Sequence, residues 1–326
     1  MENADNGNRI MAQLEPTTAN FIKKLAVQGK PPIYKLPINE AREVLNTVQK
    51  GPVEEIPVSS EDISIPAGPR GTIDLRVIRP NDGVLPVIMV FHGGGWILGN
   101  EHTHEHLIRK MAYITQAAVV FVKYTPSPEA HYPVPLEEAY AATEYIAQHG
   151  NELNLDTSRL AVAGDSVGGN MATVVTLLAK ERKGPSIIYQ ILLYPVTDAS
   201  LNTRSYEEFA DGPWLTKAAM EWFWNAYEPN KAARNQYTMS PLKASLDQLQ
   251  GLPPALIITA ENDVLRDEGE AYAHKLMQAG VQVKAVRCIG TIHDFLMLNA
   301  LANTSPTQAA MSLIQATMQE VLSSGR

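Results

Sequence analysis

A serine flanked by glycines, in the segment Gly164-Asp165-Ser166-Val167-Gly168, is the strongest chemical signal in this sequence. The apolar run 160–163 precedes it and a segment of helical character follows, so the pentapeptide occupies a strand-turn-helix junction. Glycines at both ends remove the Cβ atoms that would collide in so sharp a turn. Ser166 would then lie at a helix N-terminus, where free N–H groups and the helix dipole favour a negatively charged oxygen. We interpret Ser166 as a nucleophile; the structural alternative is a glycine-rich turn that only packs the helix on the strand.

The segment His92-Gly93-Gly94-Gly95-Trp96, called the oxyanion loop below, follows another apolar run. Three consecutive glycines at the end of a buried strand let the backbone approach a ligand closely and direct N–H groups at it. Acyl transfer needs such donors for the charge of a tetrahedral intermediate, and losing one costs about 2.7–4 kcal/mol. A flexible surface loop is the alternative. A phosphate cradle is disfavoured because the Gly-Lys-Ser/Thr and G-x-G-x-x-G contexts are absent here.

A serine nucleophile needs a base, and the base needs an orienting acid. His293 follows the last predicted strand, where a loop at the carboxyl edge of the sheet can reach Ser166. Asp263 opens the loop after the strand 255–259, and the chain order Ser166, Asp263, His293 is the one that this type of site requires. Asp198 is the reserve acid.

The remaining histidines carry weaker signals. His102, His104 and His106 alternate in a way that suggests a metal site, but a helix beginning there would spread them over different faces, and no second cluster supports them. Cys288 is the only cysteine in 326 residues, so neither an intrachain disulfide nor a cysteine-based metal cluster can form. We therefore expect no metal and no organic cofactor.

Short apolar runs alternate with helical segments from residue 86 onward, which predicts a parallel sheet wrapped by helices. A hairpin is expected before them. The predicted strands, hairpin included, cover residues 61–66, 72–78, 86–91, 118–122, 160–163, 187–193, 255–259 and 281–288. The predicted helices between them include residues 136–149, 170–182 and 268–279.

Two further segments are predicted to be helical and to lie outside the sheet. Helical spacing of apolar residues marks 21–27 and 41–50, separated by prolines. About sixty residues pass between Tyr194 and Ala255 without a core strand, so this connection must contain elements of its own. Its aromatic residues can form an apolar lid or can simply pack the insert onto the core. These aromatic residues are Phe209, Trp214, Trp222, Phe223, Trp224 and Tyr227, and the apolar Met220 lies among them in the sequence.

Together, the oxyanion loop, the Ser166 turn and the segments around Asp263 and His293 closely resemble the hormone-sensitive-lipase-like group of α/β-hydrolases, the bacterial type IV carboxylesterases. The likeness runs from about residue 60 to 300. It implies an α/β-hydrolase fold with a mostly parallel eight-stranded sheet flanked by helices and a helical cap. The implied division is residues 1–50 and 201–245 for the cap, and 51–200 and 246–326 for the core.

The resemblance also implies roles for individual residues. Ser166 is the nucleophile, His293 the general base and Asp263 its orienting acid. The N–H groups of Gly94, Gly95 and Val167 form the oxyanion hole, and His92 is structural. We expect Trp96 and Trp214 to form pocket walls.

The sequence departs from the family pattern at two places. Tyr124-Thr125-Pro126-Ser127-Pro128-Glu129 replaces the usual Tyr-Arg-Leu-Ala-Pro-Glu, which affects local packing under the sheet. Asp294 follows the catalytic histidine where glycine is frequent, and its carboxylate can raise the pKa of His293 or reshape the pocket wall.

The expected function is hydrolysis of small carboxylic esters, of short to medium acyl chain, through an acyl-enzyme. Amide hydrolysis by the same residues is an alternative, and a non-catalytic receptor of the same fold is a further one.

Acidic residues exceed basic ones by 35 to 27, which disfavours nucleic-acid and anionic-membrane partners. The N-terminal 21 residues lack the basic and apolar regions of a secretory leader, so a cytoplasmic protein is expected. The edge strand 281–288 could pair with a second copy to form a homodimer.

Overall fold

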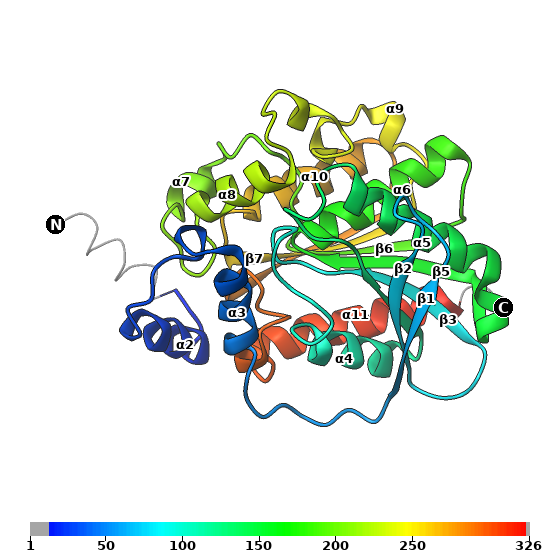
Figure 1. The fold of residues 1–326 in the computed structure, drawn as a ribbon, viewed down its shortest axis with the longest axis horizontal. Helices are drawn as coiled ribbons and strands as arrows, with labels where there is room; N and C mark the ends of the chain where they lie inside the picture. Colours follow the sequence, from blue (N-terminus) through cyan, green and yellow to red (C-terminus); the bar gives the residue numbers. More distant parts are fainter. Residues whose placement is uncertain (1–12, 324–326) are drawn as a thin grey trace.

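The structure, a computed structural model, describes residues 13–323. Within them, eight strands form one sheet in the order β1-β2-β4-β3-β5-β6-β7-β8 (Figure 1). β2 runs antiparallel to both of its neighbours, and the other pairings are parallel. The strands are β1 Ser59–Ile65, β2 Ile73–Arg79, β3 Leu85–Phe91, β4 Ala118–Lys123, β5 Leu155–Asp165, β6 Tyr189–Leu193, β7 Ala255–Asn262 and β8 Val283–Ile292. The predicted α/β-hydrolase architecture is confirmed.

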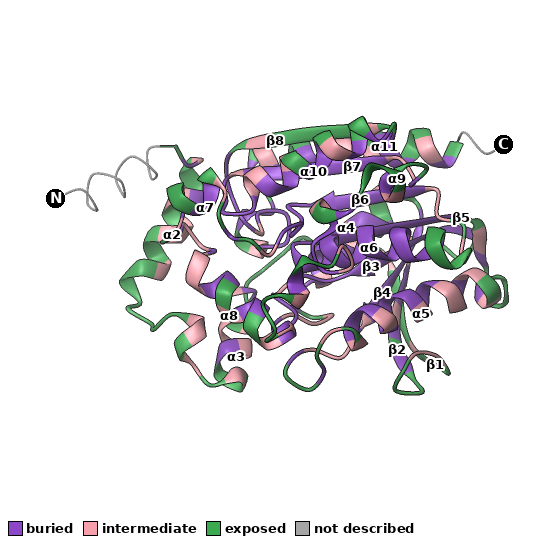
Figure 2. Cartoon of the chain, turned by 90° about the horizontal axis from the view of Figure 1, so that it is seen from above, coloured by how far each residue is buried: buried purple, intermediate pink, exposed green. Residues whose placement is uncertain are grey.

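The burial of each strand follows its place in the sheet. Every residue of β3 and β6 is buried, because these central strands are covered on both faces. The edge strands β1 and β8 are largely exposed over most of their length (Figure 2). β5 begins at Leu155, five residues before the predicted start. Residues 156–159 of this strand are polar, so the apolar pattern that predicts a buried strand begins only at residue 160.

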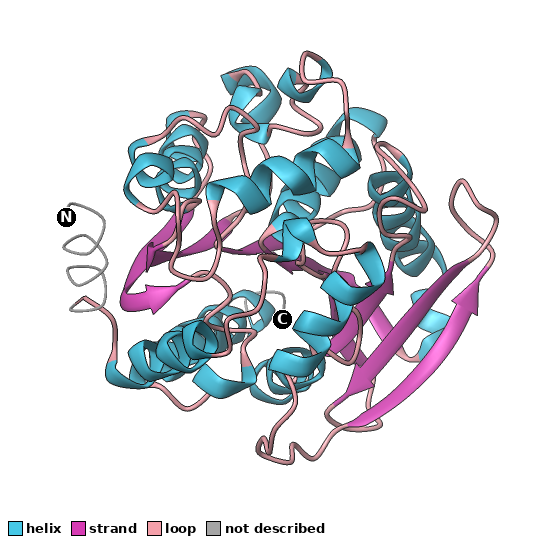
Figure 3. Cartoon of the chain, turned by 60° about the vertical axis from the view of Figure 1, so that its left-hand side comes forward, coloured by secondary structure: helices cyan, strands magenta, loops and turns pink. Residues whose placement is uncertain are grey.

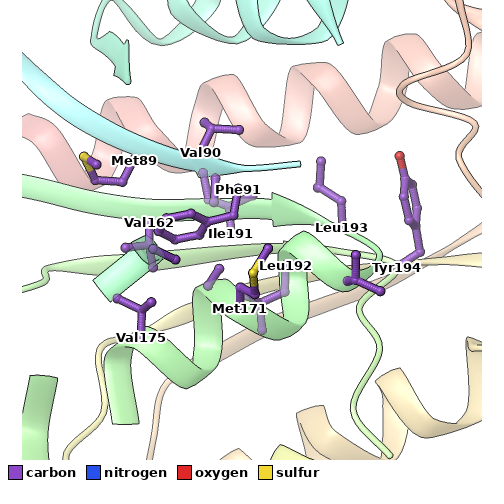
Figure 4. Close-up of a cluster of buried hydrophobic side chains, with 14 of the residues drawn as sticks. Met89, Val90, Phe91, Val162, Met171, Val175, Ile191, Leu192, Leu193 and Tyr194 are labelled. Carbon is purple, nitrogen blue, oxygen red and sulfur yellow. The ribbon is translucent and has the colours of Figure 1, made fainter. Parts of the chain in front are cut away.

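Helices cover both faces of the sheet, and the hairpin of β1 and β2 projects at one edge (Figure 3). In Figure 1, α4 and α11 lie on one side, and α5, α6 and α10 lie on the other. These helices are α4 Glu105–Thr115, α5 Val134–His149, α6 Val167–Arg182, α10 Arg266–Gln278 and α11 Ser305–Ser323. Most of α6 is buried, and its Met171 and Val175 lie beside side chains of β3, β5 and β6 in the core (Figure 4).

The register of the parallel strands aligns the segments that carry the predicted site residues. Gly164 of β5 pairs with Phe91 of β3, so the Ser166 turn and the oxyanion loop leave the sheet side by side. Asn262 of β7 pairs with Ile292 of β8, so the residues that follow them, Asp263 and His293, leave the two strands side by side. All four segments therefore emerge at the carboxyl edge of the sheet.

The two segments predicted to form a cap contain short helices. The first holds α2 Pro16–Val27, the 3₁₀ turn η1 Ile33–Lys35 and α3 Ile38–Val48; the second holds α7 Arg204–Glu208, α8 Lys217–Tyr227 and the turns η3 Ala233–Asn235 and η4 Pro241–Lys243. The other short elements are η2 Gly150–Leu153, α9 Leu246–Leu249 and η5 Asn299–Leu301. Residues 1–12 of the predicted cap lie outside the described residues.

In the described part of the chain, no helix combines the length and the apolar character that crossing a membrane requires.

Candidate active site

Ser166 alone makes the turn between β5 and α6, with φ 56° and ψ −120°. A non-glycine residue rarely adopts this conformation, and it persists only where neighbouring contacts hold it. Here the Ser166 N–H donates to the Leu193 carbonyl at 2.8 Å, and the Ser166 carbonyl accepts from Val196 at 3.1 Å. A Cβ atom at Gly168 would overlap the Phe91 carbonyl, which explains why this end of the turn requires glycine.

Ser166, His293 and Asp263 form one hydrogen-bonded series. The Ser166 Oγ lies 2.9 Å from His293 Nε2, and His293 Nδ1 lies 2.7 Å from Asp263 Oδ2. The other oxygen of Asp263 accepts from the Leu265 N–H at 3.0 Å, which fixes the carboxylate. All three side chains are buried. The structure thus brings together the three residues that the sequence selected from three different strand ends.

A second carboxylate faces His293. Asp294 Oδ1 lies 3.3 Å from His293 Nε2, the same nitrogen that contacts Ser166. Burial alone lowers the pKa of a histidine, but the charges of Asp263 and Asp294 outweigh it and raise the pKa of His293 to about 9. Burial raises the pKa of the Asp294 carboxyl, although the charge of His293 acts in the opposite direction.

The oxyanion loop lies beside this series with its glycines in conformations that other residues rarely adopt. Gly94 has φ 106° and Gly95 has φ 64°. Neither amide donates to another residue in the region 13–323, so both are available to a ligand. The Val167 N–H is the first of α6 and has no acceptor within the helix. Because Gly94, Gly95 and Ser166 line the same cavity, this arrangement can hold a substrate carbonyl against the serine.

The cavity has a volume of about 700 Å³, within the range of small-molecule sites. Its walls come from both predicted cap segments and are mainly apolar, and Ser166 and His293 lie among its lining residues. Trp214 lines this cavity, and its Nε1 donates to Asp294 Oδ2 at 2.8 Å. The Trp214 ring packs on Phe21 of α2 with centroids 5.7 Å apart, so one side chain joins the two segments to the loop that carries His293 and Asp294.

Trp96 does not reach the cavity, contrary to the expectation from sequence. It is fully buried and stacks in parallel on Tyr227 of α8, with ring centroids 4.0 Å apart. The physical reason is packing: Trp224 and Tyr227 of α8 both contact the Trp96 ring, with centroids 4.8 Å and 4.0 Å away, and hold it inside the core. Trp96 therefore packs the insert onto the core.

The reserve acid and the alternating histidines have other partners. Asp198 forms an ion pair with Lys243 at 3.0 Å and does not contact His293. His102 is exposed while His104 is buried against Asp165, so the three alternating histidines do not converge. In residues 13–323, no group of three histidine, cysteine or carboxylate side chains is placed to bind a metal ion.

Two contacts of the site were not predicted. The Tyr194 ring meets His293 edge-on, with centroids 4.9 Å apart, and so limits its rotation. Phe223 of α8 lies against Gly95, where a Cβ atom would overlap its ring. The sequence gives only a general signal for either: a tyrosine directly after a strand, and an aromatic cluster in the insert.

Comparison with known proteins identifies the family. A family model for the alpha/beta hydrolase fold matches residues 88–297. The chain belongs to this family. A putative alpha/beta hydrolase of Acanthamoeba polyphaga mimivirus is 40% identical to this hydrolase over 92% of its chain and 86% of the relative. Carboxylesterase NlhH of Mycobacterium tuberculosis (strain ATCC 25618 / H37Rv) is 41% identical over 68% of each chain.

A solved structure agrees with these relatives. The crystal structure of a thermostable esterase from Pseudomonas putida ECU1011 matches this hydrolase with a TM-score of 0.90 and 48% identity, covering 95% of this chain and 98% of that one. The predicted membership of the hormone-sensitive-lipase-like group is therefore confirmed.

Proposed function

We propose that this hydrolase is a serine carboxylesterase that cleaves small carboxylic esters through an acyl-enzyme on Ser166. The observation that carries the proposal is the series from Ser166 Oγ through His293 to Asp263, which lies at the wall of an apolar cavity beside unpaired glycine amides. Its relatives are named esterases and carboxylesterases, which supports the same reaction class.

The proposed reaction has two stages. His293 Nε2 takes the Ser166 proton as Oγ attacks the ester carbonyl, and Asp263 holds the ring by its Nδ1–H and stabilises the imidazolium. His293 then returns the proton to the leaving alcohol, and the acyl group stays on Ser166. Water attacks this ester in the second stage, again with His293 as base, and the carboxylic acid leaves. No metal or organic cofactor has a role in these steps.

The oxyanion of each tetrahedral intermediate is assigned to the N–H groups of Gly94, Gly95 and Val167. Two of these amides come from a loop and one from a helix start, and the pairing of β3 with β5, which places the two segments side by side, supports the assignment. Donors fixed in advance stabilise developing charge without reorganisation, which is the largest single contribution in many enzymes.

We assign the helices of residues 1–50 and 201–245 to a cap that binds the acyl or alcohol part of the substrate, with Trp214 as one wall. The apolar lining favours neutral esters of short to medium acyl chain.

The test is hydrolysis of p-nitrophenyl acetate, butyrate, octanoate and palmitate by the purified chain, with Ser166→Ala in parallel. We expect turnover that is lost in the variant and is greatest for a short or medium chain. Greatest turnover on palmitate would contradict the chain-length assignment. Equal turnover by the folded variant would contradict the esterase assignment.

We further propose that two copies associate through β8, which is an edge strand with Val286 and Ile289 exposed on it. Sedimentation equilibrium of the wild type and of Ile289→Lys tests this proposal: a dimer that the substitution dissociates supports it, and a wild-type monomer refutes it.

A cytoplasmic location is also proposed. It accords with the free thiol of Cys288, and detection of the native protein outside the cytoplasmic fraction would contradict it.

A further inference from the structure

One histidine of the alternating set occupies a position that the reaction described above does not explain. His104 directly precedes α4 and its side chain is fully buried, whereas the side chain of His102, two residues earlier, is 75% exposed. His104 Nε2 lies 3.2 Å from Asp165 Oδ2. Its Nδ1 lies 2.9 Å from Thr103 Oγ1, so both ring nitrogens have partners.

Asp165 connects His104 to both halves of the catalytic site. The residue directly precedes Ser166, and its Oδ1 accepts from the Gly93 N–H at 3.0 Å. Gly93 directly precedes Gly94 and Gly95. A Cβ atom at Gly93 would overlap the Asp165 carboxylate, so the close approach of loop and carboxylate depends on glycine there. One carboxylate therefore ties the Ser166 turn to the oxyanion loop.

The charges of this buried pair are complementary. Burial would raise the pKa of Asp165, but the charge and hydrogen bond of His104 outweigh it and lower that pKa. Burial would lower the pKa of His104, but Asp165 raises it. His92, whose ring centroid is 5.4 Å from that of His104, has a pKa lowered to about 4 by burial and by the neighbouring His104 charge. The contacts of His104 fit a ring that donates from both nitrogens, because Nε2 faces the Asp165 carboxylate and Nδ1 faces Thr103 Oγ1, whose own proton goes to the Asn100 carbonyl. His92, with its lowered pKa, is the neutral ring.

Other titratable groups also face the pair, and they come from the loops around it. They are Tyr124 after β4, Tyr194 after β6, and His293 and Asp294 after β8, while Glu101 before α4 acts on the neighbouring His92. Among these groups Asp294 acts on His104 in the same sense as Asp165 does, which favours the cation.

We propose that His104 is a positioning residue for the oxyanion hole: its imidazolium holds the Asp165 carboxylate, and that carboxylate fixes Gly93 so that the amides of Gly94 and Gly95 point at the substrate carbonyl. The inference rests on the proposed esterase function. It assigns His104 an effect on the tetrahedral intermediate and none on the binding of intact ester, because His104 lines no part of the cavity.

The test compares His104→Gln with His102→Gln, the same substitution at the exposed histidine. Active sites are counted by titration with diethyl p-nitrophenyl phosphate, and p-nitrophenyl butyrate gives kcat and KM. Removing one oxyanion donor lowers kcat by about 10²–10³-fold. Misaligned donors still stabilise the oxyanion in part. We therefore expect His104→Gln to lower kcat about ten- to hundredfold, with KM changed less than about twofold. His102→Gln is expected to match the wild type.

Phenylboronic acid provides a readout that a purely structural role would not move. Its adduct with the serine is a tetrahedral boronate anion, and one boronate hydroxyl oxygen occupies the place of the intermediate's oxyanion and accepts from the same amides. Its inhibition constant is expected to rise by about the factor by which kcat falls. An unchanged inhibition constant, or equal kcat values for the two glutamine variants, would overturn the inference.

A measurement on the wild type covers the case in which His104→Gln does not fold. Nitrogen NMR of ¹⁵N-histidine-labelled protein should show His104 with both ring nitrogens protonated at neutral pH, and His92 neutral. A neutral His104 would refute the proposal. Failure of the wild type to hydrolyse any ester would instead refute the proposed function, so the two failures are distinguishable.

Discussion

Replacing Asp294 by asparagine should shift the pH dependence of this hydrolase toward acid. His293 must be neutral to accept the Ser166 proton, and its pKa is raised to about 9 by Asp263 and Asp294. A raised pKa keeps the imidazolium protonated at neutral pH, so activity of the wild type should increase with pH until the proton is lost. Asparagine removes one of the two charges, while its amide oxygen can still accept from Trp214 Nε1.

The size of the shift follows from the distance between Asp294 Oδ1 and His293 Nε2, which is 3.3 Å. Two unit charges at this distance interact by about 1 kcal/mol at the dielectric constant of water and by about 5 kcal/mol at an effective value of ~20. The side chain of Asp294 is only 14% exposed, so solvent screens the pair incompletely. Since about 1.4 kcal/mol corresponds to one pKa unit, the acid limb should move down by at least about one pH unit.

The assay is kcat/KM for p-nitrophenyl butyrate from about pH 5 to about pH 10, because this ratio reports the ionisation of the free enzyme. Absorbance is read at the isosbestic wavelength of p-nitrophenol and its anion. Asp82→Asn, the same chemical change in an exposed loop, serves as the control and should leave the limb in place. An Asp294→Asn enzyme that is folded and has an unmoved acid limb would refute the electrostatic argument.

Three further substitutions have defined outcomes. Gly95→Ala should lower kcat at least about tenfold in an ester assay, because φ is 64° and the new Cβ would overlap the Phe223 ring; unchanged kcat would show that the loop tolerates a side chain. Trp214→Phe removes the donor to Asp294, worth about 1 kcal/mol, so KM should rise about fivefold with little change in kcat. Glu268→Gln should raise the melting temperature at pH 8 but not at pH 4. Burial raises the pKa of the Glu268 carboxyl in the folded protein. The wild type therefore loses folding stability as pH rises above 4.5, the ordinary pKa of the group, whereas the glutamine variant has no such ionisation and keeps its stability. A melting temperature equal to that of the wild type at both pH values would contradict this.

The sheet and the hydrogen-bonded series of Ser166, His293 and Asp263 could be predicted because their signals are local. Apolar runs mark the buried strands, and Ser166, Asp263 and His293 each follow one of them. The sequence also placed a carboxylate beside His293, at Asp294. β8 continues to Ile292, four residues beyond the prediction, because Gly290 interrupts its apolar pattern.

Other features depend on geometry that no local pattern encodes. The position of the Trp96 ring is set by its packing on Trp224 and Tyr227, residues more than 120 positions away in the sequence. The contact between His104 and Asp165 joins residues 61 positions apart. It follows only from the neighbouring positions of β3 and β5 in the sheet, so the alternating histidines suggested a metal site when read as sequence alone.

The most direct test of the central claim is intact-protein mass spectrometry after treatment with diethyl p-nitrophenyl phosphate, followed by peptide mapping. We expect one diethylphosphoryl group per chain, located on Ser166, with ester hydrolysis lost in proportion to labelling and no labelling of Ser166→Ala. Two results would contradict the assignment of Ser166 as nucleophile. One is a label on another residue that accompanies the loss of hydrolysis, and the other is full hydrolysis by protein that is completely labelled on Ser166.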